Sequence, residues 1–206
     1  MADHLEIERK FDVDSGFRRP DFAGVVPGVS AAAAVVYHLS ATYFDTVDGR
    51  LAASKITLRR RTGGADEGWH LKLPGGLPSA EGYSSRQEVQ LPLDAGGELD
   101  VPAAQAARVA EVTGGLPLGP IATLDTERTV VTLTGVDGAQ LAEIADDQVT
   151  ARRLPETAAG PLRWREIEVE VPAADPRLQQ ALADRLLAAG ARPAGHGSKL
   201  ARLLSA

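Results

Sequence analysis

HLEIERKFD, residues 4–12, alternates charged and apolar side chains, and this stretch decides the fold class that the chain suggests. Successive side chains of a β-strand point to opposite faces. Glu6, Glu8 and Lys10 therefore share one face of the predicted strand, and Ile7 and Phe11 share the other. The pattern predicts a strand that buries its apolar face and presents a row of charges on the opposite one.

Seven further segments repeat this alternation, and Gly, Pro, Asp and Ser separate them. Short alternating segments with such punctuation are typical of antiparallel strands. The predicted strands, beside residues 4–12, are residues 37–46, 55–62, 68–74, 83–92, 121–134, 140–150 and 162–172. The chain is therefore predicted to be mainly β, with eight strands.

Helices are fewer, and residues 175–189 give the clearest signals. Asp175 can cap the start of a helix, Pro176 suits its first position, and Gly190 can end it. Apolar side chains recur there at helical spacing. Further helices are expected at residues 102–112 and 198–204, with a short one within residues 15–23.

Composition limits the class of protein. The 206 residues and 44% hydrophobic content suit a single domain over residues 1–206. A net charge of −6 argues against a nucleic-acid partner. The absence of cysteine excludes disulfides and zinc–thiolate sites. No apolar run is long enough to span a membrane and no signal pattern starts the chain, so we expect a cytoplasmic protein without a membrane partner.

The charged strand faces allow two interpretations. For any one strand, the simpler one is a half-buried strand whose charges face water. Taken together, however, the polar faces are almost entirely Glu, Arg and Lys, and the amphipathic helices need an apolar sheet surface to cover. A closed eight-stranded antiparallel barrel with helices packed outside would direct these charges into its lumen. Buried charges are costly unless they are paired or bind counter-ions, which predicts a polyanion and metal ions inside.

Acidic residues on two strands have the spacing of facing carboxylate ladders. Glu6 and Glu8 form one ladder, and Glu166, Glu168 and Glu170 form the other. Carboxylate oxygens suit hard divalent cations such as Mg²⁺ and Mn²⁺. We expect these five residues to include the ligands of such a metal.

Basic residues supply the other half of the predicted lumen. Arg59 and Arg61 lie two residues apart on one strand, and guanidinium groups match phosphate oxygens in pairs. A triphosphate held by such groups and by metals needs mainly positioning and charge neutralisation to react. The candidate substrate-binding residues are Lys10, Arg59, Arg61, Lys72, Arg86, Arg128 and Lys199.

The charged motifs of this sequence resemble those of a known family. Glu6-Ile7-Glu8-Arg9-Lys10 resembles the ExExK signature of the CYTH domain, also called the triphosphate tunnel metalloenzyme superfamily. Other motifs follow in the family's order: Tyr43-Phe44-Asp45-Thr46, Leu58-Arg59-Arg60-Arg61, Lys72 before Pro74, Arg86-Gln87-Glu88, Arg128, Glu143, Glu166 with Glu168, and Ser198-Lys199. The resemblance covers residues 5 to about 204.

The resemblance implies an eight-stranded tunnel and a triphosphatase that requires Mg²⁺ or Mn²⁺. Glu6, Glu8 and Glu168 would bind metal, with Glu166 or Glu170. The seven basic residues would contact phosphates. Glu88 and Glu143 would hold metal, metal-bound water or a basic neighbour, which gives Glu6, Glu8, Glu88, Glu143 and Glu168 as the catalytic set. The sequence leaves open whether Asp146 or Asp147 faces the tunnel.

Relatives in this family act on inorganic triphosphate, thiamine triphosphate, ATP as adenylate cyclases, and RNA 5′ ends. Aromatic residues make up only 4% of this chain, and Trp69 and Trp164 are expected to be packing residues. Inorganic triphosphate is therefore the first choice, with the thiamine triphosphatase and cyclase activities as alternatives. A module that binds polyphosphate or nucleotides without cleaving them is the second hypothesis. The third hypothesis is a lipocalin-like carrier of an apolar ligand. It would need an apolar lumen, and the charged strand faces argue against it.

Two features of organisation stay open in the sequence. The chain resembles either a stand-alone domain or the first part of a longer protein in which a helical CHAD domain, a polyphosphate-binding module, follows. A homodimer is one option for its assembly.

Overall fold

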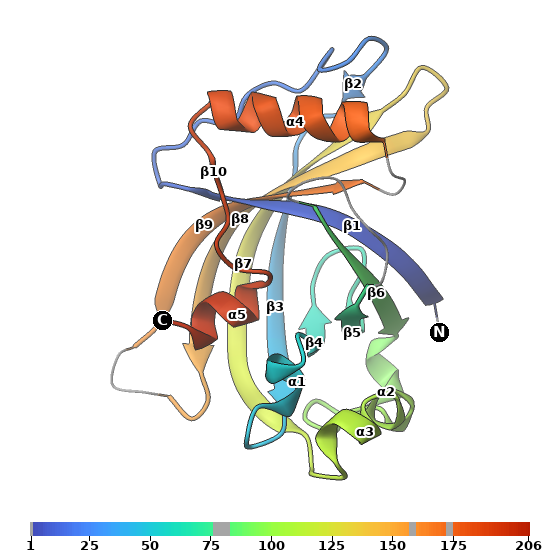
Figure 1. The fold of residues 1–206 in the computed structure, drawn as a ribbon, viewed down its shortest axis with the longest axis vertical. Coiled ribbons are helices and arrows are strands. Elements are labelled where there is room, and N and C mark those ends of the chain that lie inside the picture. Colours follow the sequence, from blue (N-terminus) through green and yellow to red (C-terminus); the bar gives the residue numbers. More distant parts are fainter. Residues whose placement is uncertain (1, 76–82, 157–159, 172–174) are drawn as a thin grey trace.

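A computed structural model describes residues 2–75, 83–156, 160–171 and 175–206, with only the backbone of residues 2–6. Eight long antiparallel strands form a closed barrel (Figure 1), which confirms the predicted fold. Their bounds are β1 Ala2–Val13, β3 Val35–Asp45, β4 Thr57–Thr62, β5 Gly68–Pro74, β6 Ser84–Leu91, β7 Gly119–Thr134, β8 Gln140–Arg153 and β9 Leu162–Val171. Two short strands, β2 Ser30–Ala31 and β10 Arg192–Pro193, pair with β7 and β1.

Strand β1 closes the barrel because it pairs with two neighbours. Its first half runs beside β6, and its second half runs beside β9. The register sets Glu6 opposite Arg86 and Lys10 opposite Glu168. Opposite charges on directly facing positions stabilise a strand pair. The motif that predicts the fold is therefore also the closing strand of the barrel.

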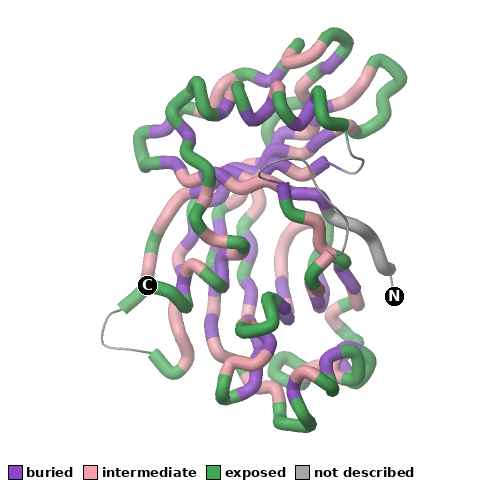
Figure 2. The backbone as a smooth tube through the Cα atoms, in the orientation of Figure 1, coloured by how far each residue is buried: buried purple, intermediate pink, exposed green. Residues whose placement is uncertain are grey.

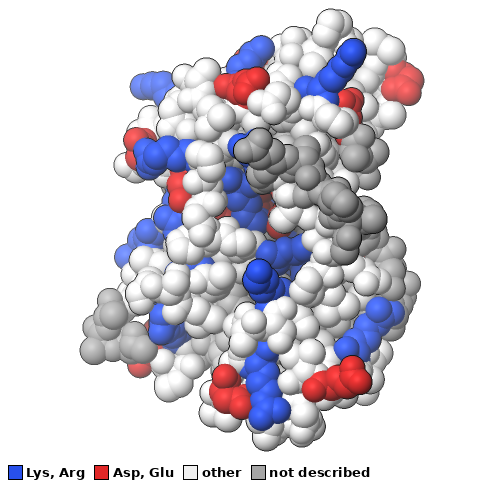
Figure 3. All heavy atoms as spheres, in the orientation of Figure 1, with Lys and Arg blue, Asp and Glu red and all other residues white. Residues whose placement is uncertain are grey.

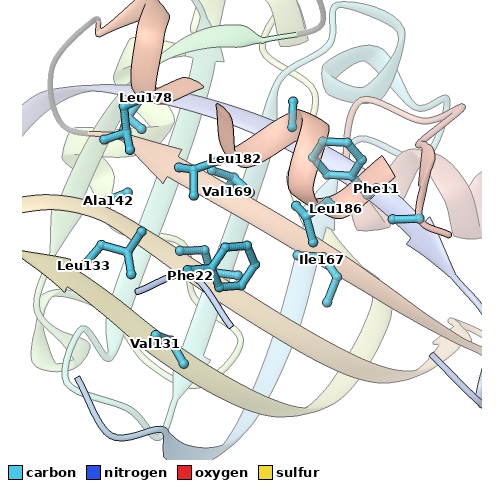
Figure 4. Close-up of a cluster of buried hydrophobic side chains, with 14 of the residues drawn as sticks. Phe11, Phe22, Val131, Leu133, Ala142, Ile167, Val169, Leu178, Leu182 and Leu186 are labelled. Carbon is cyan, nitrogen blue, oxygen red and sulfur yellow. The ribbon is translucent and has the colours of Figure 1, made fainter. Parts of the chain in front are cut away.

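The outer face of one half of the barrel packs against helix α4, Pro176–Ala188. Phe11, Ile167 and Leu182 are fully buried in this cluster, where the helix lies across β1, β7, β8 and β9 (Figure 4). The Asp175 side chain accepts hydrogen bonds from two backbone N–H groups at the start of the helix. Buried and less buried positions alternate along the strands (Figure 2), as predicted.

The outer face of the other half carries a second cluster. Short helices cover it: α1 Arg50–Ala53, η1 Leu93–Ala95, α2 Ala103–Arg108 and α3 Ala110–Thr113. Leu58, Trp69 and Val89 are fully buried there, and the rings of Trp69 and Phe44 lie 5.1 Å apart. Gln105 of α2 donates hydrogen bonds to the carbonyls of Trp69 and Val89. Trp69 is thus a packing residue, as expected.

A third apolar cluster lies inside the barrel, beneath helix α5, Lys199–Leu204. Leu200 and Leu203 pack against Leu124 and Val149, on the inner faces of β7 and β8. Leu124 lines the same small cavity as Arg128 and Lys199, which places this cluster in the lumen. Helix α5 therefore fills one stretch of the lumen, in front of β7 and β8 (Figure 1).

Two predicted helices differ from the structure. Residues 15–23 form turns and loop instead of a helix, so that prediction is wrong. Pro20 disfavours helix there, and Phe17 and Phe22 are drawn into the α4 cluster. The helix expected at residues 102–112 is divided into α2 and α3 at Val109, whose φ of −111° is not helical. In the residues that the structure describes, every helix is too short or too polar to cross a membrane.

Candidate functional site in the barrel lumen

The inner faces of the strands enclose a cavity of about 190 Å³. Basic atoms are visible in the hollow at the centre of the face in Figure 3. All seven basic residues predicted to bind substrate line this cavity: Lys10, Arg59, Arg61, Lys72, Arg86, Arg128 and Lys199. The acidic residues that line it are Glu8, Asp66, Glu88, Glu143, Glu168 and Glu170. The alternation in the sequence thus brings the predicted groups together, although their roles stay predictions.

One wall carries a compact carboxylate group. Asp147 of β8 and Glu166 and Glu168 of β9 have carboxylate oxygens within 4.8 Å of one another. The Lys199 ammonium lies 2.8, 2.9 and 2.7 Å from these three residues, in that order. Burial alone would lower the pKa of Lys199, but the three carboxylates raise it well above its usual value. Lys199 therefore stays charged at the centre of this group.

Arg128 and Lys10 complete the charge balance of this wall. Arg128 donates two hydrogen bonds to Asp147, of 2.8 and 2.7 Å, and one of 2.7 Å to Glu168. Lys10 donates to Glu8 at 2.7 Å and also to Glu168. Burial would raise the pKa of Glu168, but Lys10, Lys199 and Arg128 hold it well below its ordinary range. Four carboxylates, Glu8 among them, thus face three cations.

The wall formed by β4 is basic, and of its two inward arginines only Arg61 has an ion pair within the described residues, with Asp66. The Arg59 guanidinium donates a 3.3 Å hydrogen bond to the Tyr43 hydroxyl, and in the described residues no carboxylate lies within ion-pair distance of it. The Nε atoms of Arg59 and Arg61 are buried and have no hydrogen-bond partner in the described part of the chain. Buried donors are normally satisfied. The two buried Nε–H groups are therefore donors without an acceptor within the described residues.

Glu88 lies between two cationic or proton-bearing groups. Its carboxylate is 2.5 Å from His70 Nδ1 and 3.3 Å from Lys72 Nζ. Burial would raise the pKa of Glu88, but Lys72 and the hydrogen bond from His70 lower it strongly. His70 Nε2 lies 2.9 Å from the Asp66 carbonyl, which only accepts hydrogen bonds. Burial lowers the pKa of His70, so at neutral pH the ring carries one N–H, which serves either Glu88 or the Asp66 carbonyl.

Glu8, Glu170 and Glu143 form a row across three strands, because Glu8 is opposite Glu170 and Glu170 is opposite Glu143. Arg86 Nε lies 3.6 Å from Glu8. Burial raises the pKa of Glu143, partly offset by Arg128. Glu143 has no ion pair within the described residues, and its pKa is raised where those of Glu88 and Glu168 are lowered, so it is a better proton acceptor than either.

Several predicted positions need comment. The side chain of Glu6 lies outside the described part of the structure, although its backbone pairs with Arg86. Glu166 lies beyond the main cavity, beside Lys199, and accepts a 2.5 Å hydrogen bond from the Trp164 indole. Asp147 faces the lumen, whereas Asp146 forms an ion pair with Arg165 on the outer side. The two-residue period of β8 therefore decides the choice that the sequence left open.

Six lining residues were not among the predicted site residues: Tyr43, Thr57, Asp66, His70, Gln90 and Ser198. Alternation could have identified His70 and Gln90, which share strand faces with Lys72 and Glu88. Asp66 lies in a hairpin turn, where no periodicity indicates the direction of a side chain. Its place in the lumen had no signal in the sequence.

The sequence model of one protein family, the CYTH domain, matches residues 4–202. The chain belongs to the CYTH domain family. Two proteins of Mycobacterium tuberculosis, each described as uncharacterized, are 45% identical over 217 residues, which cover 100% of this chain and 41% of theirs. The CYTH chain therefore spans about two fifths of the length of these relatives.

Solved structures share the CYTH fold. An adenylyl cyclase candidate from Hippeastrum, described as having a dominant triphosphatase activity, aligns with a TM-score of 0.57 and 20% identity, over 97% of this chain and 95% of its own. An adenylate cyclase candidate from Bacillus halodurans aligns with a TM-score of 0.56 and 18% identity, over 98% of both chains. At these identities the likeness concerns the fold alone.

Proposed function

We propose that this CYTH domain is a divalent-metal-dependent triphosphatase that hydrolyses inorganic triphosphate to pyrophosphate and phosphate inside the barrel. The observation that supports the proposal most is the separation of charge in the lumen. On β4, Arg59 has no ion pair within the described residues and Arg61 has one, with the half-exposed Asp66, whereas Arg128 and Lys199 on the facing wall are paired with several buried carboxylates. A polyanion carrying a metal ion is the ligand that such a lumen fits.

The basic wall would hold the phosphate chain. Arg59 and Arg61 each bury an Nε–H that has no partner in the described residues, and phosphate oxygens satisfy such donors in forked geometry. Lys72 on β5 and Arg86 on β6, the next two strands of the barrel, extend the cationic surface. The energetic reason is that a buried donor without a partner is destabilising until an acceptor arrives.

The acidic wall fits a hard divalent cation. Asp147, Glu166 and Glu168 offer carboxylate oxygens close enough to share one ion, and oxygen ligands suit Mg²⁺ or Mn²⁺. Glu8 and Glu170 line the same cavity and would add ligands, and Glu6 stays a predicted ligand. When bound, the metal would neutralise phosphate charge and favour ionisation of water. Lys199 compensates these carboxylates in its absence.

The proton that the attacking water loses needs an acceptor. Glu88 is a poor one, because His70 and Lys72 already stabilise its carboxylate and lower its pKa. Glu143 has the opposite character, since burial raises its pKa and no ion pair within the described residues occupies it. We therefore assign the general base to Glu143 and a supporting role at Lys72 to Glu88.

Inorganic triphosphate remains the first choice of substrate. Tyr43 and His70 are the only ring-bearing side chains that line the cavity in the described part of the chain, and both are engaged in hydrogen bonds. A base or a thiamine ring would therefore find little to stack on. The Hippeastrum relative with triphosphatase activity is consistent with this choice. The alternative function is binding of polyphosphate without cleavage. The ion pairs within the acidic wall favour this alternative.

The test is phosphate release from inorganic triphosphate, ATP and thiamine triphosphate, each with Mg²⁺, Mn²⁺ or EDTA. We expect metal-dependent release from inorganic triphosphate in particular. Release from an organic triphosphate alone would keep the chemistry and change the substrate. Tight binding without any release would establish the binding module instead. The organisation of the longer relatives, including a following helical domain, stays a prediction.

A further inference from the structure

The turn between β4 and β5 places an acidic side chain over the basic wall. Asp66 lies in this turn, and its carboxylate forms an ion pair with Arg61. The Asp66 side chain is 59% exposed, whereas the Arg61 side chain is only 4% exposed. The pair thus joins a buried cation to an anion that already faces water, and only the anion can leave without a large loss of contacts.

The backbone of this turn is tied to the neighbouring strands through the carbonyl of Asp66. The Asp66 carbonyl accepts hydrogen bonds of 3.2 Å from Gln90 and from Arg61, and it lies 2.9 Å from His70 Nε2. At Gly63, φ is 79°, and a Cβ would come within 2.2 Å of the His38 carbonyl oxygen. Gly63 is therefore required for the path of this turn, the Asp66 carbonyl is engaged by polar groups of three strands, and the Asp66 carboxylate extends toward Arg61.

The Arg61 guanidinium is a buried charge, and a buried charge needs a counter-ion. Burial and the neighbouring Arg59 lower the pKa of Arg61 to about 10, which still leaves it charged at neutral pH. Asp66 supplies one negative charge, and it also faces Glu143 across the lumen, whose pKa it helps to raise. A phosphate oxygen bound at Arg61 would take the place of the Asp66 carboxylate. If the Asp66 carboxylate stayed at Arg61, it would repel the phosphate.

We propose that the Asp66 carboxylate is a built-in competitor for the phosphate position at Arg61, displaced when a triphosphate binds. This inference rests on the proposed substrate class. It makes Asp66 a determinant of affinity: the side chain keeps Arg61 paired in the free protein and sets how highly charged a ligand must be to displace it. A purely structural role for Asp66, holding Arg61 in place, predicts the opposite effect of its removal.

The experiment compares Asp66→Asn with wild type. We expect the KM for inorganic triphosphate to fall by about two- to fivefold, the size expected from removing one half-exposed ion pair. Asp66→Ala should shift KM in the same direction, which excludes a new hydrogen bond from Asn as the cause. Asp125→Asn is the matched control, because Asp125 is 57% exposed and pairs with Arg152 on the outer face.

A binding measurement separates this inference from the proposed function. Titration calorimetry with inorganic triphosphate in EDTA needs no turnover, and there too we expect Asp66→Asn to bind more tightly than wild type. An inactive wild type would remove the triphosphatase while tighter binding by the variant would still support the competitor. Unchanged or weaker binding, or a raised KM, would overturn it, and no binding by either protein would overturn both.

Discussion

The lumen of the barrel has a charged stretch and an apolar stretch, although the same strands line both. On β7, Arg128 and Leu124 lie on one face only four residues apart, and on β8 Asp147 and Val149 are separated by two. The change in polarity falls at the same level on each strand. The adjacent residues Lys199 and Leu200 of α5 mark it again, one in each stretch.

The difference teaches how the chain confines its anion site. The apolar stretch is filled by α5 and gains the ordinary stability of buried side chains. The charged stretch lacks this stabilisation, because its side chains are groups that can bind a ligand. Its ion pairs reduce the free-energy cost of burying those charges. Changes that exchange the characters of the two stretches should therefore have the largest effects.

The largest expected effect comes from placing a charge in the apolar stretch. Val149→Lys would bury an extra ammonium in an apolar cluster, beside an Asp147 carboxylate that already pairs with Arg128 and Lys199, and we expect a loss of about 3–5 kcal/mol in the free energy of unfolding. Urea denaturation measures it. Gln148→Lys is the matched control, because Gln148 is exposed on the outer face of the same strand. Equal stability of the two variants would refute the assignment of the apolar stretch to the interior.

The next effect comes from removing charge in the other stretch. Glu168→Gln leaves Lys10, Arg128 and Lys199 with one carboxylate fewer and removes a predicted metal ligand. We expect kcat for triphosphate hydrolysis to fall by about 10²–10³. The measurement is phosphate release over a range of Mn²⁺ concentrations, with Glu127→Gln on the outer face as the control. A kcat near that of wild type would exclude Glu168 from catalysis.

A smaller effect is expected on the basic wall. Arg59→Ala should weaken triphosphate binding by about 1.5–3 kcal/mol, the contribution of one charged hydrogen-bonding group. Titration calorimetry and KM both report it. Arg60→Ala is the matched control, since Arg60 pairs with Trp69 on the strand beside it and lies outside the cavity. If both variants bind alike, the two faces of β4 do not differ in function.

The smallest effect is a pH dependence. The pKa of Glu88 is lowered from its ordinary value of 4.5, so the charged form stabilises the fold above that pH, and the contribution is lost as the pH falls through the lowered pKa. Glu88→Gln should therefore be less stable than wild type at neutral pH, and the difference should shrink in acid. Thermal unfolding from pH 7 to pH 3, roughly the range of carboxyl titration, tests this. A constant difference would contradict it.

The sequence predicted the barrel because strand alternation is local and survives in every strand. Charged faces opposite apolar faces placed Lys10, Arg59 and Lys72 together before any tertiary contact was known. Alternation also implies that only one of Asp146 and Asp147 faces the lumen. Which of the two does so depends on the register of β8 against β9. A one-residue slip would have exchanged their faces.

Other features depend on contacts that no local pattern encodes. The turn that brings Asp66 to Arg61 relies on glycine geometry and on polar groups of three strands. The division of the lumen into two stretches depends on where α5 docks, about 50 residues after the β8 residues that it covers. The loop at residues 15–23 was mistaken for a helix because burial of Phe17 and Phe22 outweighs local propensity.

The pairing of β1 with both β6 and β9 also limits when the barrel can close during synthesis of the chain. The first strand leaves the ribosome long before β9, its closing partner, which begins at Leu162. Until then the second half of β1 presents an open hydrogen-bonding edge. Pairing across such a sequence separation gives a high contact order, and proteins of this kind fold slowly and expose edges to aggregation. Nascent chains that stop short of β9 should therefore depend most on chaperones.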